Sequence, residues 1–183
     1  VNVNVTTSNS TFVIPSDINN WPAIGDGWWG HSTNHSITLG TNYITFNGNQ
    51  YSTIWLGNGR ITLSDIGSDY TESIDEFNAN PMICPLWDIQ GWSINNTNYF
   101  GNIRYKIEND TLKIYILTRE YDGEYGWQSY SRQEYMVTFN LNTSQQGDIV
   151  FEYGRMTPGN DFPGRNVLDF GSQDGIVGIS YGS

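Results

Sequence analysis

Residues 101–121, GNIRYKIENDTLKIYILTREY, contain two runs in which apolar and polar side chains alternate, separated by the short polar segment 108–110. In the first run one face carries Ile103, Tyr105 and Ile107, and the other carries Arg104 and Lys106. Alternation with a period of two is typical of a strand that is buried on one face only. A turn of small polar residues between two such runs predicts an antiparallel hairpin.

The same pattern recurs along most of the chain. Residues 130–142 and 147–155 read as a second hairpin, and 42–65 reads as three strands with Asn-Gly turns at 47–49 and 57–59. Residues 175–183, GIVGISYGS, read as a final strand, and no window has the apolar spacing of an amphipathic helix. Strands with one apolar face pack as two sheets face to face. The sequence therefore predicts an all-β antiparallel sandwich of ten or more strands, of the jelly-roll type.

Three stretches resist assignment to strands and predict long irregular loops: 15–34, 64–80 and 154–166. Loops on a rigid sandwich are common sites of binding. No repeat or linker divides the chain, so we expect a single domain over 11–183, preceded by an extended strand and neck over 1–10.

The composition excludes some partners and favours export. The formal net charge is −11, and the basic residues are scattered, which argues against nucleic acid and against an anionic membrane surface. The chain begins with Val and contains no apolar run of membrane-spanning length, so we expect a secreted, processed, extracellular protein. The single cysteine, Cys84, lies in PMICPLWDI and is expected to be a buried small hydrophobe, with an intermolecular disulfide as the alternative.

Six Asn-x-Ser/Thr sequons also favour an extracellular glycoprotein. They begin at Asn4, Asn9, Asn34, Asn95, Asn109 and Asn142.

The order of motifs resembles that of the nidogen-type extracellular domain over roughly residues 37 to 180. The resemblance rests on FNGNQYSTIWLGNGRITL (46–63), PMICPLWDI (81–89), GNIRYKIENDTLKIYI (101–116), YMVTFNLNTSQQGDIVFEYG (135–154) and GIVGIS (175–180). It implies an adhesion or matrix β-domain without known catalytic residues.

Catalytic and metal-binding signals are weak. His31 and His35 are the only histidines, and no Ser lies in a nucleophile elbow. A sugar-cleaving groove would need paired carboxylates, for which Glu120, Asp122 and Glu124 among aromatic residues are the candidates. The same stretch also reads as a hairpin turn with solvated carboxylates, and it lacks the strand signature of jelly-roll glycanases, so the hairpin is the favoured interpretation. We therefore expect no enzyme and no cofactor, with calcium as the one candidate metal because carboxylates gather in the acidic stretch 64–80. These carboxylates are Asp65, Asp69, Glu72, Asp75 and Glu76, and a solvated loop is the alternative.

Tryptophans have two expected roles. Trp28, Trp29 and Trp92 fall in loops and are candidates for stacking against sugar rings. Trp55 and Trp87 fall in apolar strands, and we expect both in the core.

The segment VNVNVTT (1–7) points to a mode of assembly. Val1, Val3 and Val5 alternate with polar residues, as in a strand that one molecule adds to the sheet edge of another. In outline this resembles the donor-strand thread subunits of archaeal cells and bacterial pilins. The favoured prediction is a head-to-tail homopolymer, a cell-surface filament or matrix in which these valines form the subunit interface. The alternatives are pairing of this segment with its own last strand, a carbohydrate-binding or adhesive module, a secreted glycan-active enzyme, and a capsid-type jelly roll.

Overall fold

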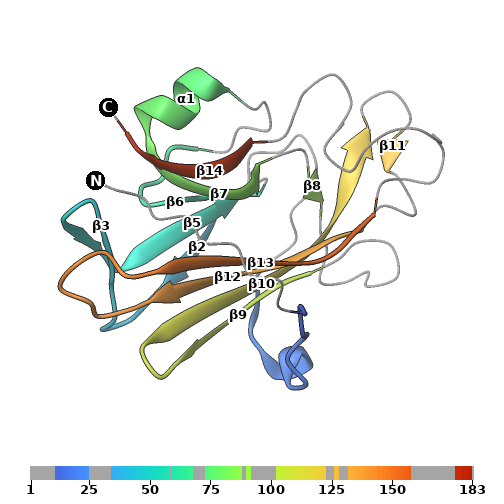
Figure 1. The fold of residues 1–183 in the computed structure, drawn as a ribbon, viewed down its shortest axis with the longest axis horizontal. Helices are drawn as coiled ribbons and strands as arrows, with labels where there is room; N and C mark the ends of the chain where they lie inside the picture. The colour runs from blue at the N-terminus through green and yellow to red at the C-terminus, as the bar shows by residue number, and fades with distance from the viewer. Residues whose placement is uncertain are drawn as a thin grey trace.

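In the computed structural model, the two main antiparallel β-sheets pack face to face, which confirms the predicted all-β sandwich (Figure 1). Its connectivity does not yet identify a jelly roll, so that detail stays a prediction. The structure describes residues 11–24, 34–57, 59–67, 73–87, 90–91, 102–122, 126–127, 132–157 and 176–182.

The larger sheet is built around the hairpin predicted over residues 101–121. Its main strands follow the order β1 (Ala23–Ile24), β9 (Ile103–Glu108), β10 (Thr111–Asp122), β12 (Arg132–Asn140) and β13 (Ile149–Thr157). Two short strands, β8 (Gln90–Gly91) and β11 (Gly126–Trp127), pair with the far end of β10. Both predicted hairpins, β9–β10 and β12–β13, are confirmed.

The smaller sheet has the order β14 (Ile176–Tyr181), β7 (Pro81–Trp87), β6 (Arg60–Thr62), β5 (Thr53–Gly57) and β2 (His35–Thr38). A separate ribbon of two strands, β3 (Ile44–Phe46) and β4 (Asn49–Tyr51), turns at Asn47-Gly48. The predicted last strand is therefore confirmed, and its described partner is β7.

The β9–β10 hairpin forms where it was predicted because its turn residues accept an unusual backbone. Asn109 and Asp110 have φ angles of 51° and 55°, the left-handed values that a two-residue hairpin turn requires at both positions. This turn sets the register, in which Ile114 lies opposite Tyr105. The apolar face of both strands therefore points into the sandwich.

Two details of residues 42–65 differ from the prediction. The expected middle strand is divided at Ser52, so β4 pairs with β3 while β5 joins the smaller sheet. Trp55 is only half-buried, because Ile54 and Leu56 take the inward positions of β5 and an adjacent residue must point outward. The expectation that Trp55 is in the core is therefore wrong, and the side chain of Trp87 lies outside the described residues.

The predicted loop 64–80 contains a short helix, α1 (Ile74–Ala79). The Ser73 hydroxyl caps it by accepting a hydrogen bond from the Glu76 amide at 3.3 Å. On the outer face of the smaller sheet Phe77 packs with Ile66 against Met82 and Cys84. With only six residues, this helix is too short to show an apolar period in the sequence, and it forms through its cap and its packing.

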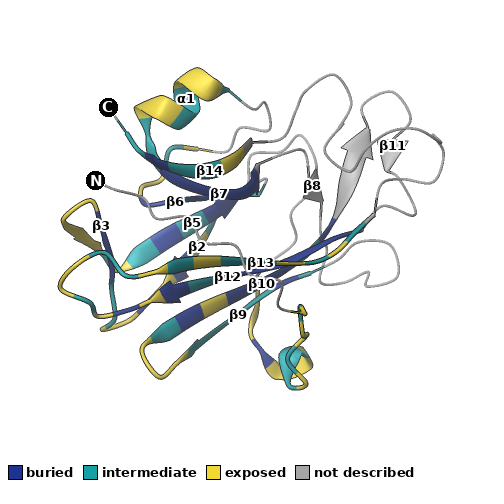
Figure 2. Ribbon diagram, viewed as in Figure 1, coloured by how far each residue is buried: buried dark blue, intermediate teal, exposed yellow. Residues whose placement is uncertain are grey.

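The main core fills the space between the sheets, and Figure 2 shows the buried stretches concentrated there. Its most deeply buried members have side chains with 0% relative exposure: Phe46, Ile54, Leu112, Tyr135 and Val137. In β12, alternate residues point into this core, since Tyr135, Val137 and Phe139 all belong to it.

A second, smaller core lies on the outer face of the larger sheet. Trp21 is buried there against Tyr115 and Met136, with Phe12, Ile18 and Leu117 around them. The segment 11–24, which includes the 3₁₀ turn η1 (Ile18–Asn20), crosses this face. Arg104 fixes it by donating hydrogen bonds to the Asn19 and Trp21 carbonyl oxygens at 3.2 and 2.7 Å.

Candidate functional site

The two strands β13 and β14 are each the last strand of their sheet in the described pairing order (Figure 1). Two hydrogen bonds join β13 and the loop before it to the smaller sheet. The Tyr153 hydroxyl on β13 donates to the Pro85 carbonyl of β7 at 2.6 Å, and Gln146 donates to the Tyr181 hydroxyl of β14 at 3.1 Å. The two sheet edges therefore lie on the same side of the molecule, and we call β13 and β14 together the open edge.

The open edge carries apolar side chains that the sandwich covers only in part. Five of them pack against the main core while remaining half-buried: Ile149, Phe151, Met156, Ile179 and Tyr181. Three more are exposed at 40% or above: Val150, Tyr153 and Val177. Unpaired edge strands with apolar side chains are the usual template for adding a strand from another segment. The arrangement can accept such a strand.

Tyr153 ties the open edge to the smaller sheet. Burial raises the pKa of its hydroxyl to about 12, so the group stays protonated at neutral pH. It therefore keeps its role as the donor to Pro85, and it holds the separation of the two sheets at this edge.

The predicted interface residues Val1, Val3 and Val5 lie outside the described residues. The described chain begins at Thr11, and Phe12 packs directly over Gly154 of β13. A Cβ atom at position 154 would lie 2.5 Å from Phe12 Cδ1, so the ring occupies the space that only glycine leaves. The described part of the chain thus begins next to β13.

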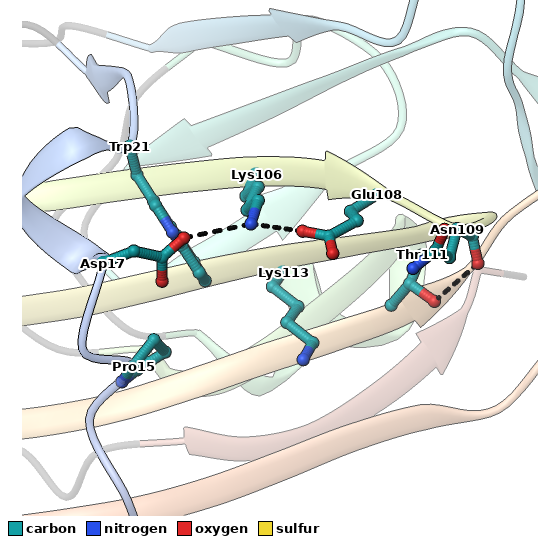
Figure 3. Close-up of a pocket in the computed structure, with 8 residues that line it drawn as sticks. All are labelled: Pro15, Asp17, Trp21, Lys106, Glu108, Asn109, Thr111 and Lys113. Carbon is teal, nitrogen blue, oxygen red and sulfur yellow. Dashed lines mark hydrogen bonds and ion pairs between the residues drawn. The ribbon is translucent and has the colours of Figure 1, made fainter.

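A pocket of about 290 Å³ lies on the outer face of the β9–β10 hairpin, next to the segment 11–24 (Figure 3). Lys106 lies between two carboxylates, with its Nζ atom 3.0 Å from Asp17 Oδ2 and also paired with Glu108. The Lys106 hydrogen bond, followed by the nearby Trp21 side chain, lowers the pKa of Asp17. The hydrogen bond to Glu108, followed by that to Asp17, raises the pKa of Lys106. The remaining lining residues are Pro15, Asn109, Thr111 and Lys113.

The five carboxylates proposed to bind calcium do not share one environment in the structure. Asp69 and Glu72 lie outside the described residues, and Asp75 is exposed in the first turn of α1. Asp65 accepts hydrogen bonds from the Asn34 amide and from the backbone of Gly67.

Glu76 pairs with the buried Arg60 at 2.5 Å. Within the described part of the chain, no group of three or more His, Cys, Asp or Glu side chains could hold a metal ion. The structure therefore gives Asp65 and Glu76 roles in packing loop 64–80, and calcium remains a hypothesis.

Other predicted residues are partly described. The backbones of Glu120 and Asp122 lie in β10, where Glu120 pairs with Gln90, and their side chains are outside the described residues, as is Glu124. Trp28, Trp29, Trp92 and His31 lie outside them as well. His35 begins β2, opposite Leu56.

Cys84 is fully buried, as predicted, and burial raises the pKa of its thiol to about 12. A thiol that is both inaccessible and neutral does not form a disulfide with another folded chain. The intermolecular disulfide is therefore not supported.

Three of the six sequons are described. Asn34, Asn109 and Asn142 lie before β2, at the tip of the β9–β10 hairpin and after β12, while Asn4, Asn9 and Asn95 lie outside the described residues.

Sequence reasoning missed Trp21, Arg60 and Tyr153. Trp21 lies in a stretch without periodicity, and the ion-pair partner of Arg60 and the hydrogen-bond partner of Tyr153 are 16 and 68 residues away. Ile149, Phe151 and Tyr153 stand at alternate positions in the sequence, but such alternation does not distinguish an edge strand from a central one.

No protein-family model, no curated protein and no solved structure matches this chain. Among the described residues, no helix has the length and apolar character needed to cross a membrane. The resemblance to the nidogen-type domain stays a prediction, and the open edge is the feature on which a functional argument can be built.

Proposed function

We propose that this chain is an extracellular structural subunit of a cell-surface filament or matrix. Neighbouring subunits are joined when the segment 1–7 of one chain adds as a strand to the open edge of the next. The observation that carries the proposal is that β13 and β14 lie on the same side, with apolar inner-face side chains half covered.

An added strand supplies a pairing partner, which no described strand gives to the outer side of β13 or β14. Its backbone groups pair with the outer N–H and C=O groups of β13 or β14, and its inward side chains cover the exposed core. In VNVNVTT the inward positions fall to Val1, Val3 and Val5, which have no charge and favour extended backbone. The alternating Asn2, Asn4 and Thr6 then face solvent.

Because the described chain begins next to β13, two acceptor edges are within reach of the segment 1–7. Ten extended residues span about 33 Å, enough to reach the edge of the same molecule or that of a neighbour. Insertion into a neighbour that receives nothing in return is heterologous and extends into a filament. Reciprocal insertion between two copies closes a dimer, and insertion into the chain's own edge gives a monomer.

Deletion of residues 1–8 tests this proposal. We expect a folded monomer with an unfolding midpoint close to that of the full chain, while the full chain forms larger particles in light scattering. If the full chain is a monomer and the deletion lowers its stability, the segment belongs to its own sandwich. A full chain that forms only dimers would replace the filament with a reciprocal exchange.

A matched pair of substitutions separates strand insertion from a general effect of charge. Val3→Asp places a carboxylate at an inward position and is expected to abolish assembly, since burying an unpaired charge is costly. Asn4→Asp adds the same charge at an outward position and is expected to leave assembly intact at moderate salt. Equal loss of assembly in both variants would contradict insertion with this alternation.

A further inference from the structure

The three described sequons differ in whether their side-chain amides are free to react. N-linked glycosylation replaces one of the two hydrogens on Asn Nδ2, so a sequon whose amide donates two structural hydrogen bonds loses one of them when it is modified.

Asn142 is closed in this sense. Its Nδ2 atom donates to Asn42 Oδ1 at 2.8 Å and to the Asp110 carboxylate at 2.7 Å. Its Oδ1 atom accepts from the Tyr43 amide at 3.2 Å. A sugar on this nitrogen would have to occupy the position of one of these acceptors. The loops that meet at Asn142 would then separate.

Asn34 is closed in the same way. Its Nδ2 atom donates to Asp65 Oδ1 at 3.1 Å and to the Gly67 carbonyl at 2.5 Å. These two bonds hold the beginning of the acidic stretch 64–80 against the strand β2, which starts one residue later.

Asn109 is open. It is exposed at the tip of the β9–β10 hairpin, and its side-chain amide makes no hydrogen bond to the described residues. The hydroxyl of Thr111, the third residue of this sequon, donates to the Asn109 carbonyl at 3.3 Å and steadies the turn. Figure 2 shows this tip exposed, away from the packed interior.

The pocket described above begins at Asn109, and its character suits a neutral, hydroxyl-rich group. It contains two lysines, Lys106 and Lys113, and two carboxylates, Asp17 and Glu108, so its charges balance and do not favour an anion. Its volume of about 290 Å³ is near the lower end for small-molecule sites, about 300–1,000 Å³, which fits one sugar ring better than a long chain. Figure 3 shows Lys113 beside Thr111 with no bond drawn to the other lining residues.

We propose that Asn109 carries an N-linked glycan whose first sugar lies against this pocket, while Asn34 and Asn142 stay unmodified in the folded protein. The donor is a lipid-pyrophosphate-linked oligosaccharide. The bond from its sugar C1 to the pyrophosphate oxygen breaks, Nδ2 of Asn109 forms the new bond to C1, and one Nδ2 proton is lost. The proposal rests on the export part of the proposed function and is independent of strand insertion.

Glycopeptide mass spectrometry of the chain secreted from an N-glycosylating host tests the site. Enzymatic removal of the glycan in ¹⁸O water converts a modified Asn to a heavy Asp, and we expect this mark at Asn109 with intact amides at Asn34 and Asn142. An unmodified Asn109, or predominant modification of Asn34 or Asn142 in the folded fraction, would overturn the proposal. Because assembly is read separately by light scattering, its failure and failure of this site are distinguishable.

Amine labelling tests where the first sugar lies. The chain has only two lysines, and both line the pocket, so the modification rate of Lys113 reports directly on its occupancy. In the glycosylated chain we expect Lys113 to react several-fold more slowly than in Asn109→Asp, which keeps the left-handed turn and removes the sequon. Equal rates in the two proteins would show that the sugar points into solvent and would overturn this half of the proposal.

Discussion

At the scale of single residues, Asn142 joins three loops that are distant in the sequence. Its side chain bonds Asn42, Tyr43 and Asp110, and its amide donates to the Tyr43 carbonyl at 2.9 Å. Its φ angle of 59° is one that asparagine tolerates better than most residues do. The residue therefore combines a backbone conformation and a set of hydrogen bonds that alanine cannot supply.

We expect Asn142→Ala to lower the free energy of unfolding by about 3 kcal/mol. A hydrogen bond to a charged group contributes about 1.5–3 kcal/mol and a neutral one about 0.5–1.5 kcal/mol. Asn142→Gly is the control, because it keeps the positive φ without strain and isolates the lost hydrogen bonds. Urea unfolding of both variants measures the effect; a change below about 0.5 kcal/mol in Asn142→Ala would contradict this role.

The ion pairs of Lys106 predict a dependence on pH. The folded pKa of Asp17 is lowered by Lys106 and Trp21, so its contribution is complete above the unfolded pKa of about 3.9 and is lost as the pH falls through the folded value. The folded pKa of Lys106 is raised by Glu108 and Asp17, so its contribution is complete below about pH 10.4 and is lost as the pH rises further. The group therefore contributes most between about pH 4 and 10.

Melting temperatures of the wild type and Asp17→Asn across this range measure that contribution. We expect the difference between the two proteins to shrink as the pH falls below 4, because the wild type then loses the same charge by protonation. A difference that stays constant down to pH 2 would show that Asp17 acts through something other than its charge.

At the scale of elements, the segment 11–24 depends on the absence of a side chain at Gly154. A Cβ atom there would lie 2.5 and 2.7 Å from two Phe12 ring carbons, closer than packed atoms allow. Gly154→Ala is therefore expected to displace Phe12 and cost about 1–3 kcal/mol, the usual effect of overpacking. The chain between Thr11 and Trp21 should also become easier to cleave with protease.

A double-mutant cycle with Phe12→Ala separates this contact from an effect on β13 itself. In the Phe12→Ala background we expect Gly154→Ala to cost little, because the ring that it strikes is gone. Additive effects on the free energy of unfolding would mean that the two residues do not interact.

Elements with local signals were predictable. The β9–β10 hairpin follows from alternation on both sides of Asn109-Asp110, whose residue types accept left-handed backbone. The division of a strand at Ser52 was not predictable, because alternation continues across it and only the pairing partners change. Trp55 was misplaced for a related reason: an apolar strand does not reveal which of two adjacent residues points inward until its register is known.

The candidate site was predictable only in part. The alternation of the segment 1–7 is visible in the sequence, but which strands end each sheet is a non-local property of pairing. Neither the position of β13 and β14 on the same side nor the pocket at Lys106 has a local signal, since both arise from residues far apart in sequence. The loop 64–80 was correctly recognised as acidic, while its packing role through Glu76 and Arg60 required the structure.

At the scale of the whole molecule, assembly and monomer stability are expected to be separate properties. Among the residues that the structure describes, the buried members of the main core all fall between Ile24 and Leu141. The half-covered side chains of the open edge lie at one border of this core. Adding a strand there would extend the sheet without rearranging it, which is how a folded subunit can join a filament.

The most direct measurement of this account is disulfide trapping between two separately purified variants, Asn4→Cys and Glu152→Cys. Positions 4 and 152 both face outward in the proposed pairing. The native Cys84 is buried and does not compete for the bond. A third variant, Val150→Cys, tests a pairing that is shifted by two residues along β13. After mixing and mild oxidation, we predict a covalent dimer that joins Cys at position 4 of one chain to the edge position of the other. A chain that carries both substitutions provides the opposite test. If it closes the bond within single chains, and the mixed single variants form no dimer in either register, assembly by strand exchange between subunits is contradicted.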